Sequence, residues 1–249
     1  MMADVFVSFG FGTIGIARRG PVTIIRLQRP ERLNAYTPEM GEDLVAAFRA
    51  MTDDESVAAV VVTGEGKAFC AGADHGCFTE PPGPSGLRIG EEAFVKGFAA
   101  ELRDHPKLLI AAFNGAAVGI GVSMSLCFDL RLAATDSRLK LNFAEHGIMP
   151  GFGATYVLPH LVGLGQAKKL LLCEPLIGAG EALAIGLVDE VCAPADLIER
   201  ACALGAAAAR LRPGAARKIK RALNRSVEEG FAAALQAEAA SDLRKEARA

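Results

Sequence analysis

The stretch KAFCAGADHG (67–76) brings three reactive side chains, Cys70, Asp74 and His75, into one short turn after an apolar run. This turn could form a metal site, a thiol nucleophile with its base, or a loop whose backbone amides bind a ligand. The spacing of these residues and Cys77 matches no zinc pattern, and no second cluster completes a tetrahedral site. Cys70 ends the apolar run, where a small buried hydrophobe is the simpler interpretation, and nothing in the sequence indicates a thiolate. The metal and thiol interpretations are therefore disfavoured.

A second glycine-rich segment, NGAAVGIGVSM (114–124), follows another apolar run and opens a helical pattern. Met124 stands where dinucleotide binding would need a third glycine, so a Rossmann-type oxidoreductase is not indicated. Both loops follow a buried strand and expose backbone N–H groups, the second at a helix start. Two such groups directed at one oxygen form an oxyanion hole, which needs small residues around it. Tight strand–helix packing explains either loop alone, but the pair favours the hole.

The composition sets broad limits on the class of protein. The chain has 249 residues, of which 51% are hydrophobic and 22% charged, which is typical of a globular protein with a sizeable core. A net charge of −2 gives no electrostatic footprint for nucleic acid. Neither a signal peptide nor an apolar run of about 18 residues is present, so we expect a cytoplasmic protein that binds no membrane. Six scattered cysteines, mostly in apolar runs, suit reduced thiols.

The elements that must position the loops can be read from periodicity and turn residues. TIGIARR and VTIIRLQRP, joined at Gly20-Pro21, predict a hairpin, and Thr37 before Pro38 predicts a helix start. Further strands are predicted at VAAVVVTG, LLIAAFNG, DLRLAAT and RLKLN. Residues 79–90, rich in proline and glycine, are expected to form the most mobile loop, followed by a helix over 91–104.

From about residue 155 the pattern becomes helical. We therefore predict a β/α core over 1–195 that carries the ligand site, followed by a C-terminal helical region over 196–249. Its alanine-rich final stretch of about 35 residues is expected to break near Gly230 and is long for a helix that packs only on its own domain.

The chain resembles the crotonase, or enoyl-CoA hydratase/isomerase, superfamily in four segments that occur in the family's order and spacing: RPERLNA (29–35), KAFCAGAD (67–74), NGAAVGIG (114–121) and GIMPGFGAT (147–155). The resemblance covers nearly the whole chain. It implies an α/β fold, a spiral of ββα turns whose C-terminal helical region forms trimers or dimers of trimers. It also implies an acyl-CoA or acyl-carrier-protein substrate, and no cofactor beyond the CoA or phosphopantetheine moiety.

The resemblance implies that the two glycine-rich loops, 67–76 and 114–124, together form the oxyanion hole. The N–H groups of Ala73 and Ile120 would bind the thioester carbonyl as it becomes an enolate, and Asp74 would brace the first loop. The family usually has glycine where Ile120 stands, so this side chain is expected to narrow the acyl pocket.

The resemblance also implies further ligand contacts. The adenine end of CoA would contact Arg32, Leu33, Ala35 and Ala71, with Arg32 meeting phosphates.

Three positions near the acyl chain depart from the family's carboxylates. Hydratases of the family carry glutamates where this chain has Ser123 and Phe143, and some isomerases carry an acid where it has Gly151. General acid–base catalysis needs a titratable group within hydrogen-bond reach, so hydration of a crotonyl-type thioester is expected to be very slow.

Two titratable side chains remain as candidates for proton or carboxylate handling. His75 follows the Ala73 donor by two residues, and Glu145 lies two positions beyond Phe143. The chain also partly resembles the decarboxylating crotonase homologues of polyketide β-branching cassettes, which lack the same two glutamates. We therefore expect decarboxylation or double-bond isomerisation through an enolate. A hydratase with non-standard acid–base residues and an inactive acyl-CoA-binding subunit are the alternatives.

Overall fold

The computed structural model describes residues 10–212 and 214–229. Its strands are β1 (Ile14–Arg19), β2 (Val22–Leu27), β3 (Ala59–Gly64), β4 (Ala68–Cys70), β5 (Leu108–Phe113), β6 (Ala116–Val118), β7 (Leu130–Ala134), β8 (Arg138–Lys140), β9 (Ile177–Gly178) and β10 (Glu190–Cys192). Six of them form one sheet in the order β1-β2-β3-β5-β7-β10, and four form a second in the order β4-β6-β8-β9. The β1–β2 and β8–β9 pairs are antiparallel, and the other pairs are parallel.

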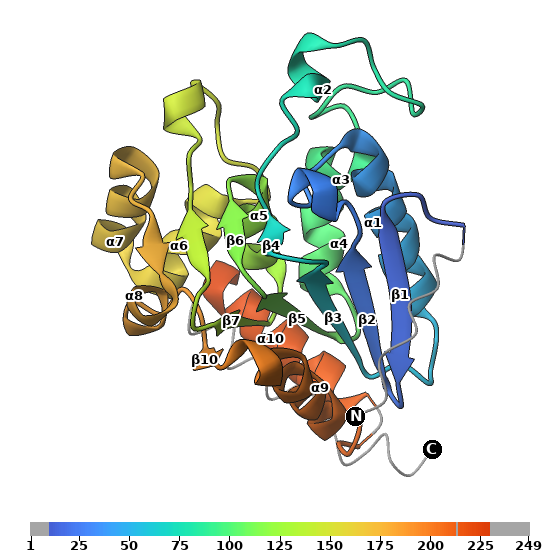
Figure 1. Cartoon of the computed structure of the whole chain (residues 1–249). Coiled ribbons are helices and arrows are strands. Elements are labelled where there is room, and N and C mark those ends of the chain that lie inside the picture. Colours follow the sequence, from blue (N-terminus) through green and yellow to red (C-terminus); the bar gives the residue numbers. More distant parts are fainter. Residues whose placement is uncertain (1–9, 213, 230–249) are drawn as a thin grey trace.

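From β3 to β8 the strands alternate between the two sheets, which makes the fold a spiral. β3, β5 and β7 each lie in the larger sheet, and the strand that follows each of them, β4, β6 and β8, lies in the smaller one. Helical segments after β4 and β6 return the chain to the larger sheet, whereas those after β8 lead first to β9 of the smaller sheet and then, through α8, to β10 of the larger one (Figure 1). The predicted α/β spiral of ββα turns is confirmed.

The α-helices are α1 (Pro38–Thr52), α2 (Gly76–Thr79), α3 (Ala93–Lys96), α4 (Phe98–Asp104), α5 (Ile120–Ser123), α6 (Ala154–Val162), α7 (Leu164–Lys168), α8 (Ala179–Ala184), α9 (Leu197–Ala208) and α10 (Ala215–Glu229). A π-helical turn, Lys169–Cys173, extends α7, and 3-10 turns occupy Pro30–Arg32, Met124–Cys127, Ala144–His146 and Pro194–Asp196. The Thr37 side chain accepts a hydrogen bond from the Met40 amide and caps α1, as predicted.

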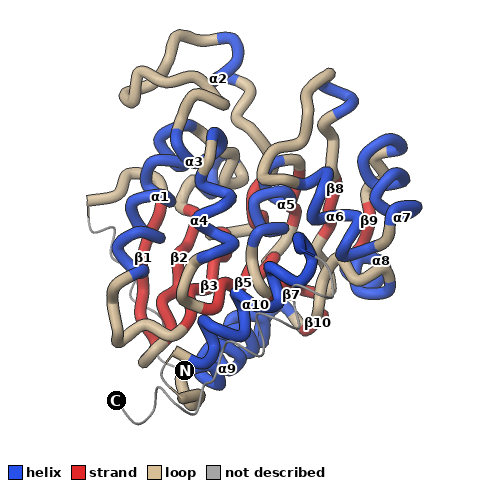
Figure 2. The backbone as a smooth tube through the Cα atoms, turned by 180° about the vertical axis from the view of Figure 1, so that it is seen from behind, coloured by secondary structure: helices blue, strands red, loops and turns tan. Residues whose placement is uncertain are grey.

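Both faces of the larger sheet are covered, which explains why its central strands β2, β3, β5 and β7 are mainly apolar and mostly buried. Residues of α1 and α4 join the main core on one face. On the other face, Leu197, Ala201 and Cys202 of α9 pack against a separate apolar cluster of β2, β3, β5 and β7 (Figure 2). A Cβ on Gly205 would lie 2.8 Å from the Ala59 Cβ, so glycine lets α9 approach the sheet closely. The first helix of the predicted C-terminal region therefore contributes to the core.

Several predicted elements differ from those observed. The helix predicted over 91–104 is two helices, α3 and α4, separated at Gly97. The segment from 155 to 195 is not all-helical, because β9 and β10 lie within it. These strands have two and three residues, and so short a segment carries no readable periodicity.

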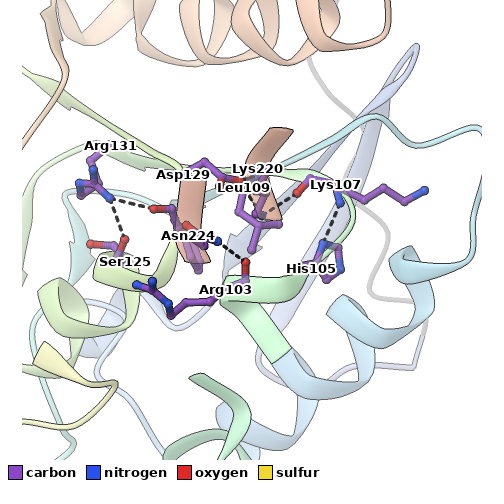
Figure 3. Close-up of polar contacts among 10 residues, drawn as sticks. Arg103, His105, Lys107, Leu109, Ser125, Asp129, Arg131, Lys220 and Asn224 are labelled. Atoms are coloured by element: carbon purple, nitrogen blue, oxygen red, sulfur yellow. Dashed lines mark hydrogen bonds and ion pairs between the residues drawn. The ribbon is translucent and has the colours of Figure 1, made fainter. Parts of the chain in front are cut away.

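Helix α10 is held against the body of the chain by polar contacts (Figure 3). The Lys220 ammonium donates to the Asp129 carboxylate at 2.8 Å and to the Lys107 carbonyl at 3.1 Å. The same Asp129 oxygen accepts from the Leu109 amide at 2.7 Å. Burial lowers the pKa of Lys220 below its ordinary value, although the Asp129 charge opposes this effect.

Two neighbouring contacts complete this junction. The Asn224 amide donates to the Arg103 carbonyl, and Arg221 forms a two-pronged ion pair with Asp104 at the surface. The predicted break near Gly230 lies outside the described residues. Within the described part of the chain, no helix combines the length and the apolar character that a membrane crossing requires.

Candidate active site

The AGAD loop (residues 71–74) is held by backbone hydrogen bonds to Tyr36, in the segment that precedes α1. The Tyr36 amide donates to the Gly72 carbonyl, and the Asp74 amide donates to the Tyr36 carbonyl, both at 2.8 Å. Ala73 lies between these two bonds in a parallel bridge with Tyr36. Because neighbouring peptide groups in an extended chain point to opposite sides, the Ala73 N–H points away from Tyr36.

The segment RPERLNA holds the partner side of this bridge. Leu33 and Asn34 both adopt positive φ angles, 50° and 55°, which turn the chain sharply beneath the loop. The fully buried Asn34 amide donates to the Glu65 and Ala68 carbonyls, and its oxygen accepts from the Arg29 amide. These contacts compensate for the conformation and explain the asparagine in the motif.

Asp74 is anchored to Arg29 beside the loop. The two side chains form an ion pair at 2.9 Å, and the other Asp74 oxygen accepts from the Gly76 amide at 3.1 Å. Burial alone raises the pKa of the Asp74 carboxyl, but these hydrogen bonds outweigh it, so its pKa lies below the ordinary value. This geometry supports the bracing role expected for Asp74.

The second elbow is shaped by two glycines. Gly119 has φ 53° and ψ −115°, a combination that side chains beyond glycine rarely adopt. A Cβ on Gly121 would lie 2.4 Å from the Cys70 carbonyl oxygen, so glycine permits α5 to sit against β4. Ile120, between them, is the first residue of α5. Across the described residues, neither the Ile120 N–H nor the Ala73 N–H has a protein acceptor, so both are available to a ligand.

Both N–H donors belong to the lining of one cavity of about 500 Å³. It also contains the predicted site residues Ala71, His75, Ser123, Phe143 and Gly151. Much of the remaining wall is apolar, with side chains of Phe78, Ile89, Val95, Ile148, Met149 and Phe152. A concave, mainly apolar site with few polar groups is typical of a small-molecule pocket.

Two histidines are the titratable side chains in this lining. The rings of His75 and His146 lie 6.0 Å apart, centroid to centroid, in an edge-to-face arrangement. Asn142 is also part of the wall, and its side-chain nitrogen donates to Nε2 of His146 at 3.0 Å. His146 received no role from the sequence, where it stands as one residue of a loop, far along the chain from His75.

The remaining predicted residues lie outside the lining. Glu145, the second candidate for proton handling, forms a 2.6 Å ion pair with Lys140, which lowers the pKa of the Glu145 carboxyl. Arg32 and Leu33 are exposed beside the loop, and Ala35 is half-buried. The cavity thus excludes Glu145 and gains His146 in its place.

Cys70, beneath the loop, is completely buried. Burial raises the pKa of its thiol to about 11, so it is un-ionised near neutral pH. This environment supports the packing role over the nucleophile.

Comparison with known proteins identifies the family. Residues 17–246 match the family model described as enoyl-CoA hydratase/isomerase. A short-chain-enoyl-CoA hydratase of Clostridium acetobutylicum is 34% identical over 217 residues, which are 86% of this chain and 81% of that protein. A 1,2-epoxyphenylacetyl-CoA isomerase of Escherichia coli is 32% identical over 172 residues, covering 68% of this chain and 66% of the relative.

Solved structures agree with the sequence relatives. A crystal structure of enoyl-CoA hydratase from Bacillus anthracis superimposes with a TM-score of 0.83 at 31% identity, covering 91% of this chain and 88% of that one. Three observations therefore indicate the same family: the spiral fold, the two loops with open N–H groups, and the match over nearly the full chain. The chain belongs to the crotonase, or enoyl-CoA hydratase/isomerase, family of enzymes that act on acyl-CoA thioesters.

Proposed function

We propose that the protein converts an acyl thioester through an oxyanion-stabilised enolate, by double-bond isomerisation or decarboxylation in preference to hydration. One observation carries the proposal: the described cavity lining has two open N–H donors and two histidines, and no carboxylate. Ser123 and Phe143 occupy the positions at which the resemblance implies the hydratase glutamates. A pair of carboxylates for activating water is therefore absent from the lining.

Double-bond migration fits this set of groups. An imidazole of the His75–His146 pair removes the α-proton of a β,γ-unsaturated thioester, and the electron pair moves onto the thioester oxygen. The Ala73 and Ile120 N–H groups stabilise the resulting dienolate. The imidazolium then returns the proton to the γ-carbon. One histidine that alternates between base and acid completes the cycle.

Decarboxylation needs even less of the protein. When the C–C bond to a vinylogous carboxylate breaks, CO₂ leaves, and the electron pair of that bond stays on the acyl chain and forms the same dienolate. A protonated His75 or His146 then delivers one proton to carbon. Both alternatives rest on the chemistry of the lining residues, because the relative named as an isomerase acts on an epoxide, 1,2-epoxyphenylacetyl-CoA.

Recognition of the carrier and self-association remain part of the proposal. Arg32, Leu33, Ala35 and Ala71 would contact the CoA or phosphopantetheine carrier, as the resemblance implies. A trimer or dimer of trimers is supported by Ile219, Leu223 and Val227, which repeat every four residues along α10 and are 49%, 63% and 43% exposed. Light scattering that shows a monodisperse monomer would contradict this part.

The experiment compares three substrates and three single variants. Crotonyl-CoA, 3-butenoyl-CoA and glutaconyl-CoA are followed by mass spectrometry with the wild type, His75→Ala, His146→Ala and Glu145→Gln. We expect slow hydration of crotonyl-CoA and turnover of 3-butenoyl-CoA or glutaconyl-CoA. At least one histidine variant should lose roughly 10²–10⁴ in rate, the usual contribution of a general acid–base group.

Glu145→Gln is the matched control, because Glu145 lies in the same loop as His146 but outside the lining. Fast crotonyl-CoA hydration would instead favour a hydratase with non-standard residues. Tight binding without turnover of any thioester would favour an inactive binding subunit.

A further inference from the structure

Ser123 is an unusual buried serine. It is 1% exposed and forms part of the cavity wall, yet its hydroxyl has no hydrogen-bond partner among the described residues. Ser125 and Ser137 are completely buried as well, and each donates to a backbone carbonyl, Val122 at 2.6 Å and Phe113 at 2.7 Å. Most buried polar groups in proteins have partners, so the exception at the cavity wall requires an explanation.

One turn back, the Gly119 and Ile120 carbonyls already accept backbone amides, and the Ser123 hydroxyl bonds to neither, whereas the Ser125 hydroxyl does donate to the carbonyl three residues before it. The Gly119 carbonyl oxygen there already accepts from the Val122 and Ser123 amides, both at 3.0 Å. A carbonyl oxygen has two lone pairs, so a third donor would compete for an occupied acceptor. A hydroxyl left unpaired in an apolar environment is destabilising, which favours a partner supplied by the ligand.

The position of Ser123 indicates which part of a ligand would meet it. Ser123 follows the Ile120 donor by three residues on α5, which is nearly one helical turn, or about 4.5 Å along the axis. Side chains three residues apart lie on the same side of a helix. A thioester carbonyl held at the Ile120 N–H therefore brings its β-carbon and the substituents of that carbon near Ser123.

We infer that the acyl group bound in this cavity carries an oxygen function on its β- or γ-carbon, a hydroxyl, ketone or carboxylate, and that the Ser123 hydroxyl donates to it and determines specificity. The inference rests on the proposed function, because it takes the ligand to be a thioester held by the Ala73 and Ile120 amides. A purely hydrocarbon acyl group would leave the hydroxyl unpaired, so of the two substrates proposed above glutaconyl-CoA should be preferred over 3-butenoyl-CoA. Sites built around a hydrogen bond discriminate strongly against analogues that lack it.

The test measures affinity with two pairs of isosteric probes, by isothermal titration calorimetry on the full chain. 3-Hydroxybutyryl-CoA is compared with 3-methylbutyryl-CoA, and succinyl-CoA with 4-methylpentanoyl-CoA. These saturated probes have no double bond to migrate. We expect the wild type to bind at least one oxygenated probe about tenfold more tightly than its apolar partner. The pair that shows the preference distinguishes a hydroxyl from a carboxylate.

Two serine variants complete the design. Ser123→Ala should reduce the preference to within about threefold, whereas Ser125→Ala should keep it. Thermal unfolding supplies the second readout. Ser125→Ala loses a hydrogen bond and should lower Tm by about 2–4 °C, whereas Ser123→Ala removes an unpaired hydroxyl and should leave Tm equal or higher.

Three results would overturn the inference. One is equal affinity within both probe pairs, and another is a preference that survives in Ser123→Ala. The third is a loss of Tm in Ser123→Ala as large as in Ser125→Ala, which would make Ser123 a structural residue. If none of the four thioesters binds although 3-butenoyl-CoA or glutaconyl-CoA is turned over, the specificity inference fails alone; if turnover is absent as well, the proposed function fails with it.

Discussion

The α10 junction and the cavity of the candidate active site differ in whether their polar groups have hydrogen-bond partners in the protein. At the junction, the Lys220 ammonium, the Asp129 carboxylate and the Asn224 amide all have protein partners. In the cavity, the Ala73 and Ile120 N–H groups have none in the described part of the chain. The junction is complete as it stands, because its hydrogen bonds close within the protein and hold a helix in place.

The difference separates stability from function. A satisfied buried network contributes to the folded state, so damage to it should appear mainly in unfolding measurements. An unsatisfied donor on a ligand-facing wall weakens the free protein and strengthens the complex, so damage should appear mainly in binding or rate. Variants at the junction should therefore change mainly the free energy of unfolding, and variants in the cavity mainly ligand affinity or reaction rate.

The largest effect is expected at the oxyanion hole. Ala73→Pro deletes one N–H donor and also distorts the loop, and loss of one donor typically costs roughly 10²–10³ in rate. Ala73→Gly keeps the donor and is the control for the methyl group. Steady-state turnover of the accepted thioester measures both. Full activity of Ala73→Pro would remove Ala73 from the hole.

The second effect belongs to the junction and concerns stability. Asp129→Asn leaves the Lys220 charge without its counterion, and breaking a buried pair costs roughly 3–5 kcal/mol. We expect about 3 kcal/mol, at the low end of that range, because the two side chains retain 11% and 17% exposure. Denaturant unfolding gives the free energy, and hydrogen exchange along α10 shows whether the helix detaches first.

Asp104→Asn is the matched control for this variant. Asp104 pairs with Arg221, the residue after Lys220, but these side chains are 54% and 42% exposed. An exposed ion pair contributes only about 0.2–1 kcal/mol. Equal destabilisation by the two substitutions would show that burial of the Lys220–Asp129 pair is not what holds α10.

Much of this architecture could be predicted from local pattern. The β1–β2 hairpin and the Thr37 cap follow from residue types that act over a few positions. Gly97 divides the helix predicted over 91–104, and β9 is defined by pairing with a distant strand that its two residues do not announce. Local sequence therefore predicts long helices and strands better than it predicts breaks within a helix or very short strands.

The site shows the same limit. The two loops could be found from glycine spacing, but the approach of His146 to His75 depends on how the loops fold together. The sequence indicates Glu145 as the second candidate after His75, two positions beyond Phe143, yet Glu145 pairs with Lys140 and lies outside the cavity lining. Side-chain pairing across distant segments is a tertiary property, and residue spacing does not carry it.

A smaller effect is expected from pH at His105, which lies beside the junction in Figure 3. Burial lowers its pKa below the ordinary value of 6.5, and nearby Lys220 adds to this, although hydrogen bonds oppose it. The unfolded chain therefore takes up a proton near pH 6.5 while the folded chain does not, so stability falls as pH drops below 6.5. Unfolding free energies at pH 7.5 and 5.5 should show a steeper loss in the wild type than in His105→Gln. Parallel losses in the two proteins would contradict this assignment.

The smallest effect is expected at the outer end of the ligand site, where Arg32 is exposed beside the AGAD loop. If Arg32 meets a phosphate of the carrier, Arg32→Ala should raise the Kd of a CoA thioester by a few-fold, because an exposed ion pair contributes about 0.2–1 kcal/mol. Salt screens such contacts over about 10 Å at 0.1 M ionic strength, so the difference should be clear at low salt and shrink as salt rises. Arg18→Ala is the control, since Arg18 pairs with Asp54 on a different part of the surface and should leave Kd unchanged. An unchanged Kd for Arg32→Ala at low salt would place the phosphates elsewhere. The Ala73 and Ile120 donors are proposed to bind the acyl carbonyl at the other end of the ligand, so their assignment is tested separately by Ala73→Pro.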